Sequence, residues 1–290
     1  MVTRVWTGGY DLNLASDPLN WSTAGLGKHG APKPGDSLVM STGTMNIYGG
    51  NLAHDTLTIF TGQGQPGTDV TMLNANVKID VLPSNGGISS FFPLFNAFGN
   101  DTVIYSGIGT SVFDIGGNSS LGGSFRGNII VNGPGIFSPH SLILDNGSGA
   151  TINADVRGAG TIELSGTPTS SSDIFFVGAV GKGQAVDVSS YSYVTIDKPT
   201  EFKASINLAA NATSDAIELY GLGTADSYTL RKDLLSFSDA SGKVIDTIHI
   251  NAAANAIQAE VSVYGVYLFI GETAPTLSGW NILPYHGTGG

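Results

Sequence analysis

Short apolar runs, each bounded by Gly, Asn, Asp or Pro, recur from one end of the chain to the other. Apolar and polar residues alternate in Thr56 to Ile59 and again along Val70 to Ile79. Such alternation predicts strands that have one face in a core and the other face in solvent. No segment sustains the spacing of an amphipathic helix, so the pattern predicts an all-β protein.

The central part of the chain has the most repetitive pattern. Apolar triplets separated by Gly, Asn and Ser occur at residues 127–133, 141–147 and 160–166. Short strands joined by tight corners are typical of a parallel β-helix, in which Gly or Asn occupies corners with positive φ. We therefore expect a right-handed parallel β-helix (a solenoid). An antiparallel β-sandwich is the alternative, because it produces similar apolar runs.

The last third of the chain has longer strand-like runs, including Lys243 to Ile250 and Val261 to Ile270. We therefore expect three parts. Residues 1–210 form the β-solenoid with an N-terminal capping unit, and residues 211–271 form a C-terminal β unit that continues or caps it. Residues 272–290 form an extended tail.

The composition narrows the classes of function. Charged residues make up 12% of the 290 residues and hydrophobic residues 41%, which excludes a disordered chain. The 41 glycines are spread along the sequence and fit turns between strands. The net charge of −11, with scattered basic residues, disfavours nucleic acid and anionic lipid as partners.

The absence of cysteine excludes disulfide bonds and thiolate metal sites. No apolar run reaches the roughly 18 residues of a membrane-spanning helix, so we expect no membrane insertion. Residues 1–9 lack the apolar segment of a cleavable Sec signal. The acidic, weakly charged composition, rich in Ser, Thr, Asn and Gly, nevertheless suits an extracellular or cell-surface protein, which is the location we expect.

Three motifs near the N-terminus carry a family resemblance: Trp-Thr-Gly-Gly at residues 6–9, Asp-Pro-Leu-Asn-Trp-Ser at 17–22 and Pro-Gly-Asp-Ser-Leu-Val at 34–39. In this order they resemble a unit of large secreted β-solenoid passengers, adhesin-like proteins of Gram-negative bacteria. The segment from Asp215 to Ile270 is similar to a second unit of these proteins. Residues 284–290 resemble the junction before a C-terminal Hedgehog/intein-like domain in alphaproteobacterial members. The resemblance implies adhesion, filaments or a biofilm matrix, and carries no catalytic residue over.

The two ends of the chain are the regions where we expect self-association. The ends of a solenoid carry strand edges that need partners, and a strand of a neighbouring subunit can pair there by β-augmentation. The run Val261 to Ile270 is uncharged, β-prone and free of Pro, which is typical of such a strand. We predict a homopolymer. The residues expected to take part are Val2, Arg4, Trp6, Val261, Val263, Tyr267, Phe269, Trp280 and Tyr285.

The alternative function is a carbohydrate-active β-helix enzyme or a carbohydrate-binding module. Glycoside hydrolysis uses two carboxylates roughly 5–10 Å apart. Asp145, Asp155 and Glu163 follow successive central strands and are candidates, with Arg126 and Arg157 near them in sequence. No nucleophile elbow, P-loop or His-Glu-x-x-His motif occurs, so we assign no catalytic residue and expect a protein that is not an enzyme.

Four further aromatic residues are candidates for contact with polysaccharide or another partner: Trp21, Phe91, Phe92 and Phe95. Trp6 and Trp21 have a second interpretation, as side chains that cap the first coil. The histidines are isolated, so we predict no metal site. We expect no cofactor, with Asp239 in the turn 238–243 as a candidate calcium ligand or, more simply, the head of an Asx turn.

Overall fold

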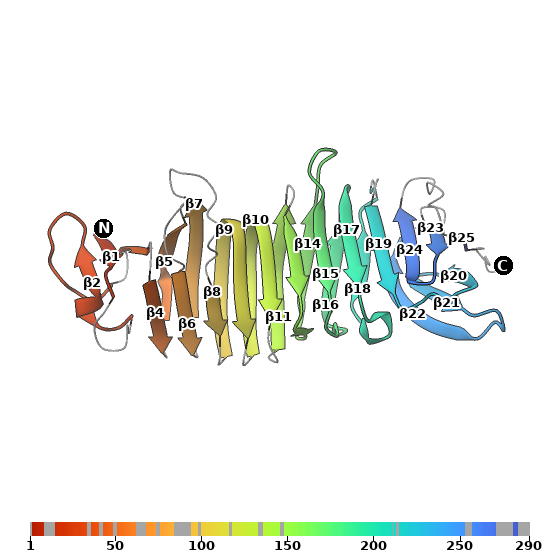
Figure 1. The fold of residues 1–290 in the computed structure, drawn as a ribbon, viewed down its shortest axis with the longest axis horizontal. Coiled ribbons are helices and arrows are strands. Elements are labelled where there is room, and N and C mark those ends of the chain that lie inside the picture. Colours follow the sequence, from red (N-terminus) through yellow and green to blue (C-terminus); the bar gives the residue numbers. More distant parts are fainter. Residues whose placement is uncertain are drawn as a thin grey trace. The chain divides into compact units, whose positions relative to one another are not determined.

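The computed structural model is built from strands and two 3-10 helices, with no α-helix among the residues it describes (Figure 1). The described residues are 2–8, 15–33, 36–40, 43–48, 51–61, 68–73, 76–83, 94–97, 100–115, 118–132, 136–145, 148–210, 212, 215–252, 257–270 and 281–283. Within these ranges, no helix has the length and hydropathy needed to cross a bilayer. The chain divides into two compact units, residues 1–138 and 139–290. The boundary expected at residue 210 lies inside the second unit.

The first unit is a stack of parallel strands preceded by a short cap. Its elements are β1 (Thr3–Trp6), the 3-10 helix η2 (Pro18–Asn20), β2 (Trp21–Thr23), β3 (Ser37–Met40), β4 (Gly43–Tyr48), β5 (Asn51–Thr61), β6 (Thr68–Leu73), β7 (Asn76–Pro83), β8 (Leu94–Ala97), β9 (Asn100–Ile115) and β10 (Asn118–Asn132). Alternate strands pair in parallel, so that β3, β5, β7 and β9 form one row and β4, β6 and β8 form another. Each coil therefore adds one strand to each of two rows.

The N-terminal cap consists of β1, η2 and β2. Trp6 and Trp21 meet edge to face, with ring centroids 5.1 Å apart. The indole Nε1 of Trp21 donates a hydrogen bond to the backbone carbonyl of Ala15 at 2.8 Å. Arg4 forms an ion pair with Asp36 at 3.1 Å. The two tryptophans are buried, so they close the apolar interior of the first coil.

The second unit contains the remaining elements. They are β11 (Ile136–Asp145), which begins just before the boundary, β12 (Gly149–Ile152), β13 (Asp155–Val156), β14 (Gly160–Ser165), β15 (Ser172–Phe176), β16 (Gln184–Val188), β17 (Ser192–Ile196), η3 (Pro199–Glu201), β18 (Ser205–Leu208), β19 (Asp215–Tyr220), β20 (Ser227–Arg231), β21 (Leu234–Ser238), β22 (Val244–Asn251), β23 (Ile257–Val261), β24 (Gly265–Ile270) and β25 (Asn281–Ile282). We call the row β11–β14–β16–β18 sheet one and the row β12–β15–β17–β19 sheet two. Both rows are parallel (Figure 1).

The register of sheet one gives the length of a coil. Ser141 is paired with Thr161, Thr161 with Ala185, and Ala185 with Ser205, so that the successive coils contain 20, 24 and 20 residues. Parallel bridges from Val156 to Val180 and from Val180 to Phe202 mark a third, shorter side of the same coils. This topology confirms the expected all-β parallel β-solenoid, and the β-sandwich alternative is wrong for the coils.

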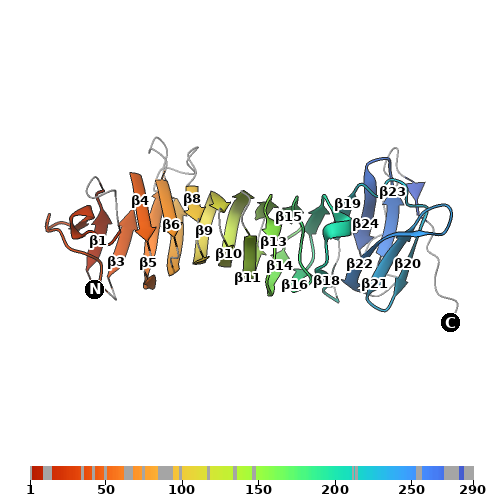
Figure 2. The same ribbon diagram turned by 90° about the horizontal axis from the view of Figure 1, so that it is seen from below.

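The C-terminal part of the second unit changes from parallel to antiparallel pairing. Sheet one continues with β22 in parallel, followed by β21 and β20 in antiparallel order. Sheet two continues with β24, β23 and β25, all antiparallel. The sequence predicted longer strands in this region, but of β20 to β24 only β22, with 8 residues, is longer than the 5 or 6 residues of β14 to β17. Strands β20 to β25 extend both sheets of the solenoid (Figure 2).

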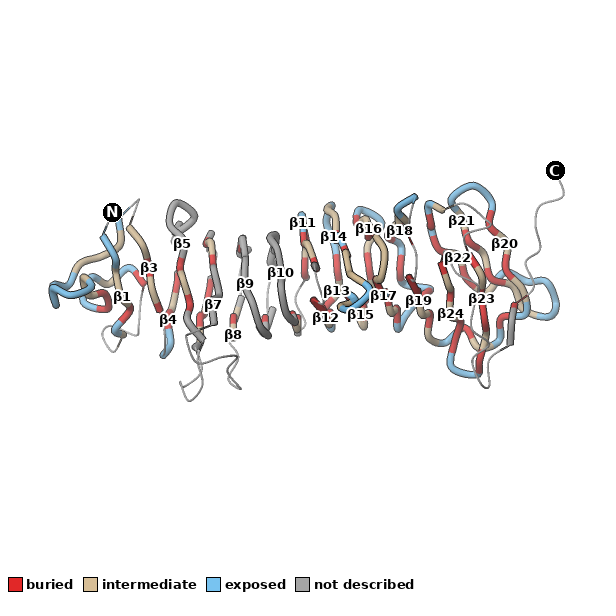
Figure 3. Tube along the Cα trace, turned by 90° about the horizontal axis from the view of Figure 1, so that it is seen from above, coloured by how far each residue is buried: buried red, intermediate tan, exposed pale blue. Residues whose placement is uncertain are grey.

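Buried residues alternate with more exposed residues along the described strands (Figure 3), and the strand register stacks the buried ones in columns that repeat once per coil. Two of the columns are Leu142, Ile162, Val186 and Ile206 in sheet one, and Ile152, Phe176, Ile196 and Leu219 in sheet two. Each of these side chains is buried. Because parallel strands in register place equivalent residues above one another, an apolar residue at one coil position is buried between its two neighbours.

Glycines at the coil corners permit this stacking. Gly158 has a φ of +81°, a conformation that costs little only for glycine. In the next coil, a Cβ added to Gly183 would lie 2.2 Å from the carbonyl oxygen of Gly158. The corner therefore needs glycine in both coils, once for its backbone angle and once for close approach.

Candidate functional site

The outward face of sheet two carries a group of aromatic side chains from four adjacent strands. Along β15, β17, β19 and β24, buried core residues alternate with residues that point outward. The register aligns the outward residues in two columns, Phe175–Thr195–Glu218–Tyr267 and Asp173–Tyr193–Ala216–Phe269. We call the side chains of Phe175, Tyr193, Tyr220, Tyr267 and Phe269 the aromatic face.

Four of the five rings of the aromatic face form two close pairs. The ring centroids of Tyr267 and Phe269 are 4.7 Å apart, and those of Phe175 and Tyr220 are 6.4 Å apart. Tyr193 is 40% exposed, the most accessible of the described large apolar residues on these strands. Since neighbouring strands are about 4.8 Å apart, four strands extend over roughly 14 Å. That is longer than one sugar ring.

Carboxylates are interspersed with the rings. Partial burial raises the pKa of Glu218, although a hydrogen bond from the Tyr220 hydroxyl opposes that shift. Partial burial also raises the pKa of Asp173. The negative charge of Glu218 in turn raises the pKa of Tyr220, with burial and Asp197 adding to the effect.

Tyr267 lies in the same negative environment. Burial, together with the neighbouring Tyr193 and Glu218, raises its pKa to about 12. Each of these shifts arises from desolvation or from negative charge, since both disfavour the charged form of an acid. The outward side of sheet two therefore combines apolar rings with hydrogen-bond acceptors in a negative electrostatic environment.

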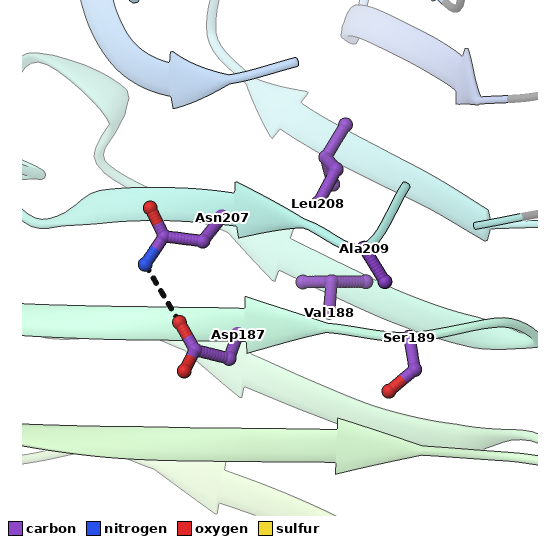
Figure 4. Close-up of a pocket in the computed structure, with 6 residues that line it drawn as sticks. All are labelled: Asp187, Val188, Ser189, Asn207, Leu208 and Ala209. Carbon is purple, nitrogen blue, oxygen red and sulfur yellow. Dashed lines mark hydrogen bonds between the residues drawn. The ribbon is translucent and has the colours of Figure 1, made fainter. Parts of the chain in front are cut away.

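Sheet one has an outward face of different chemistry. Its central column runs from Ile143 through Glu163, Asp187 and Asn207. The amide Nδ2 of Asn207 donates to Asp187 Oδ1 at 2.7 Å, beside an open, shallow depression of about 320 Å³ (Figure 4). Ser189 also lines this depression, and its Oγ donates to the backbone carbonyl of the preceding coil at 3.0 Å. The polar groups of this face are thus largely paired within the ladder.

The three carboxylates that were candidates for catalysis occupy different register positions. Glu163 lies in register with Asp187 on sheet one. Asp145 lies two positions further along the strand from that column. Asp155 belongs to β13, where its carboxylate accepts a backbone hydrogen bond and lies 3.6 Å from the guanidinium of Arg157. Arg126 belongs to β10 in the first unit. The predicted trio therefore does not form one column.

The N-terminal residues expected to self-associate lie in the cap. β1 pairs with β2 along one edge and with β3 along the other. The side chains of Arg4 and Trp6 are engaged within the cap, whereas Val2 is 38% exposed. Because both edges of β1 are paired, contact through Val2, Arg4 or Trp6 requires side-chain packing rather than strand addition. Self-association through these residues stays a prediction.

The C-terminal candidates have three different environments. Val261 is half-buried in β23, and Val263 is 86% exposed in the turn that leads to β24. Tyr267 and Phe269 belong to the aromatic face. Trp280 and Tyr285 lie outside the described residues.

The candidates for partner contact also differ in position. Trp21 is fully buried in the N-terminal cap. Phe95 is fully buried as well, and its ring stacks on Phe113 with centroids 4.7 Å apart. These two residues present no surface to a partner, because they fill the interior of their coils. Phe91 and Phe92 lie outside the described residues.

The turn at Asp239 is an Asx turn. Its Oδ1 accepts hydrogen bonds from the Ser241 backbone N–H at 2.9 Å, the Ser241 hydroxyl at 2.6 Å and the Lys243 backbone N–H at 3.1 Å. The bond from Ser241 is the main cause of its lowered pKa. Three donors thus occupy the oxygen that calcium would need. Within the described ranges, no group of three or more His, Asp and Glu side chains is placed to hold a metal ion.

Sequence reasoning missed the aromatic face as a unit. Phe175, Tyr193 and Tyr220 were not among the candidates, and Tyr267 and Phe269 were selected for strand pairing. Alternation within each short run places these residues on the outward side. Their alignment across strands depends on coil lengths of 20 to 24 residues, which follow from the register.

Comparison of the chain with models of known protein families, with curated proteins and with solved structures gave no match. The functional argument therefore rests on the chain's own geometry and chemistry.

Proposed function

We propose that this chain is an extracellular or cell-surface adhesive protein that binds polysaccharide through the aromatic face. The observation that carries the proposal is the alignment of five aromatic rings and interspersed carboxylates on the outward side of sheet two. The outward column of sheet one, by contrast, holds Glu163, Asp187 and Asn207. The resemblance to secreted β-solenoid adhesins supports the same role.

The chemistry of sugars matches this surface. A hexose ring has an apolar face of C–H groups that stacks on aromatic rings, and its rim of hydroxyl groups donates hydrogen bonds. Tyr and Phe provide flat apolar area at small cost in side-chain entropy. Carboxylates such as Asp173 and Glu218 accept charge-assisted hydrogen bonds from hydroxyl groups. Binding of this kind needs no reacting pair of carboxylates, so the proposal includes no catalysis.

The test is retention of the purified chain by immobilised polysaccharides, with cellulose, chitin and soluble β-glucans as probes. We expect Tyr193→Ala to weaken binding about fivefold or more, because one stacking ring contributes on the order of 1 kcal/mol. Tyr264→Ala is the matched control, since Tyr264 is 70% exposed in the β23–β24 turn and lies off the face. The proposal fails if no polysaccharide is retained, or if both variants lose binding equally.

Self-association into filaments or a surface matrix is a second candidate. Its supporting observation is β20, which pairs only with β21 within the described part of the chain. An edge strand of this kind can accept a strand of a second copy. Negative-stain microscopy and sedimentation over a range of concentrations test this candidate. Filaments that are lost in Thr229→Pro but kept in Thr229→Ala would support it, and a monomer at every concentration would exclude it.

A further inference from the structure

The aromatic face combines aromatic rings and carboxylates without any basic side chain. None of its four strands, β15, β17, β19 and β24, contains Lys, Arg or His. Asp173 and Glu218 point outward from these strands, and Asp197 follows directly after β17. Asp173 is paired in register with Tyr193, Glu218 is paired with Tyr267, and Tyr220 interacts electrostatically with Glu218 and Asp197. No cation of the same strands neutralises these carboxylates.

Aromatic rings and carboxylates both attract an ammonium group. Glu218 and Tyr267 are directly opposite each other in the antiparallel pair β19–β24, which places their Cβ atoms about 5 Å apart. A carboxylate attracts an ammonium group by Coulomb interaction, and an aromatic ring attracts it through its quadrupole. Burial partly desolvates Glu218 and raises its pKa, although the Tyr220 hydroxyl opposes the shift. A bound ammonium group would compensate that desolvation.

We infer that the polysaccharide bound by the aromatic face carries free amino groups, as in a partly N-deacetylated hexosamine polymer. This inference rests on the proposed function and adds the chemical class of its ligand. Repulsion between like charges also favours an amino polysaccharide over an acidic one. A uronic acid polymer would bring like charges onto Asp173, Asp197 and Glu218, which disfavours that ligand.

The pairing of the strands favours a polysaccharide over a basic peptide. Each of the four strands is hydrogen-bonded to a neighbour on both sides, β15 by β12 and β17, and β24 by β19 and β23. A peptide therefore cannot pair with these strands through backbone hydrogen bonds. A face of rings that extends over about 14 Å instead suits successive sugar units.

The test compares chitosans of graded N-acetylation, hydroxyethylcellulose and alginate as probes in affinity electrophoresis of the whole chain. We expect affinity to rise with the fraction of free amine and to fall about fivefold or more between low and high salt, because screening weakens charge attraction. Alginate should not retard the chain. Glu218→Gln should reduce retardation by the amine-rich chitosans more strongly than it reduces retardation by hydroxyethylcellulose. Glu201→Gln, an exposed change in η3, is the matched control.

The outcomes separate the inference from the proposed function. Equal binding of fully acetylated and deacetylated polymers, or preference for alginate, overturns the inference and leaves polysaccharide binding intact. The inference is also overturned if poly-lysine competes as effectively as chitosan at matched charge, because the face would then recognise positive charge alone. If no polysaccharide retards the chain, the proposed function fails. The salt series uses the unmodified chain, so an unfolded variant does not obscure the result.

Discussion

Asp246 is a carboxylate on the inner side of the C-terminal sheet, and replacing it with Asn should stabilise the protein at neutral pH. It lies on β22 with 7% of its surface exposed, opposite the fully buried Phe237. Within the described part of the chain, its Oδ2 has no hydrogen-bond partner. Burial raises its pKa, and a hydrogen bond from the Thr247 backbone and the charge of Lys203 offset only part of this shift.

The expected gain follows from the cost of a buried, unsatisfied acceptor, which is about 1–3 kcal/mol. The folded-state pKa of Asp246 lies above the unfolded value, so the folded protein prefers the protonated acid. This contribution to stability is fully present below the unfolded pKa, and it is lost as the pH rises through the folded pKa. Asn resembles the protonated acid in shape. We therefore expect Asp246→Asn to raise the free energy of unfolding at pH 7 by about 1–3 kcal/mol, and by little at pH 3.

The assay is urea unfolding followed by circular dichroism at both pH values, with the variant always compared with the parent chain. Subtracting the two curves removes the effect of every other titrating group. Asp226→Asn is the control, since Asp226 is an exposed carboxylate of the same region, and we expect a clearly smaller gain in stability at pH 7 from it. A gain at pH 3 as large as that at pH 7, or a loss of stability at pH 7, would refute the reasoning.

Three further predictions concern the packing of the second unit. Phe176→Ala should lower the free energy of unfolding in urea by about 3–5 kcal/mol, because Phe176 is fully buried and meets Phe202 edge to face at 5.6 Å. Phe175→Ala should cost clearly less, because Phe175 points outward. Equal losses would contradict the assignment of inward and outward side chains. Gly265→Ala should destabilise the unit, because the added Cβ would lie 2.0 Å from the carbonyl oxygen of Leu219 and β24 would have to shift; unchanged unfolding would argue against that pairing. Ultraviolet titration should show one tyrosine that ionises only near pH 12, and this late step should vanish in Tyr267→Phe.

Local sequence was sufficient for the strands and for the type of fold. In β14, β16 and β17, each apolar residue that alternation predicts as inward is buried, for example Ile162, Val186 and Val194. Glycine at the corners was readable too, because glycines fall between the apolar runs, where tight turns favour them. The parallel order of the coils was the expected consequence of such short strands. The antiparallel pairing among β20 to β25 had no clear signal, since strand length alone does not set direction.

For the candidate site, too, the sequence determined one part and the tertiary structure another. The sequence by itself determined which residues of each short strand point outward, because the period of a strand is two. Only the tertiary structure decided which of them meet, since coils of 20 and 24 residues shift the alignment and antiparallel β24 adds Tyr267 beside Glu218. It also placed Phe95 and Trp21 inside, although both were candidates for contact. Long-range register depends on the summed length of every corner, and no single run of residues contains that information.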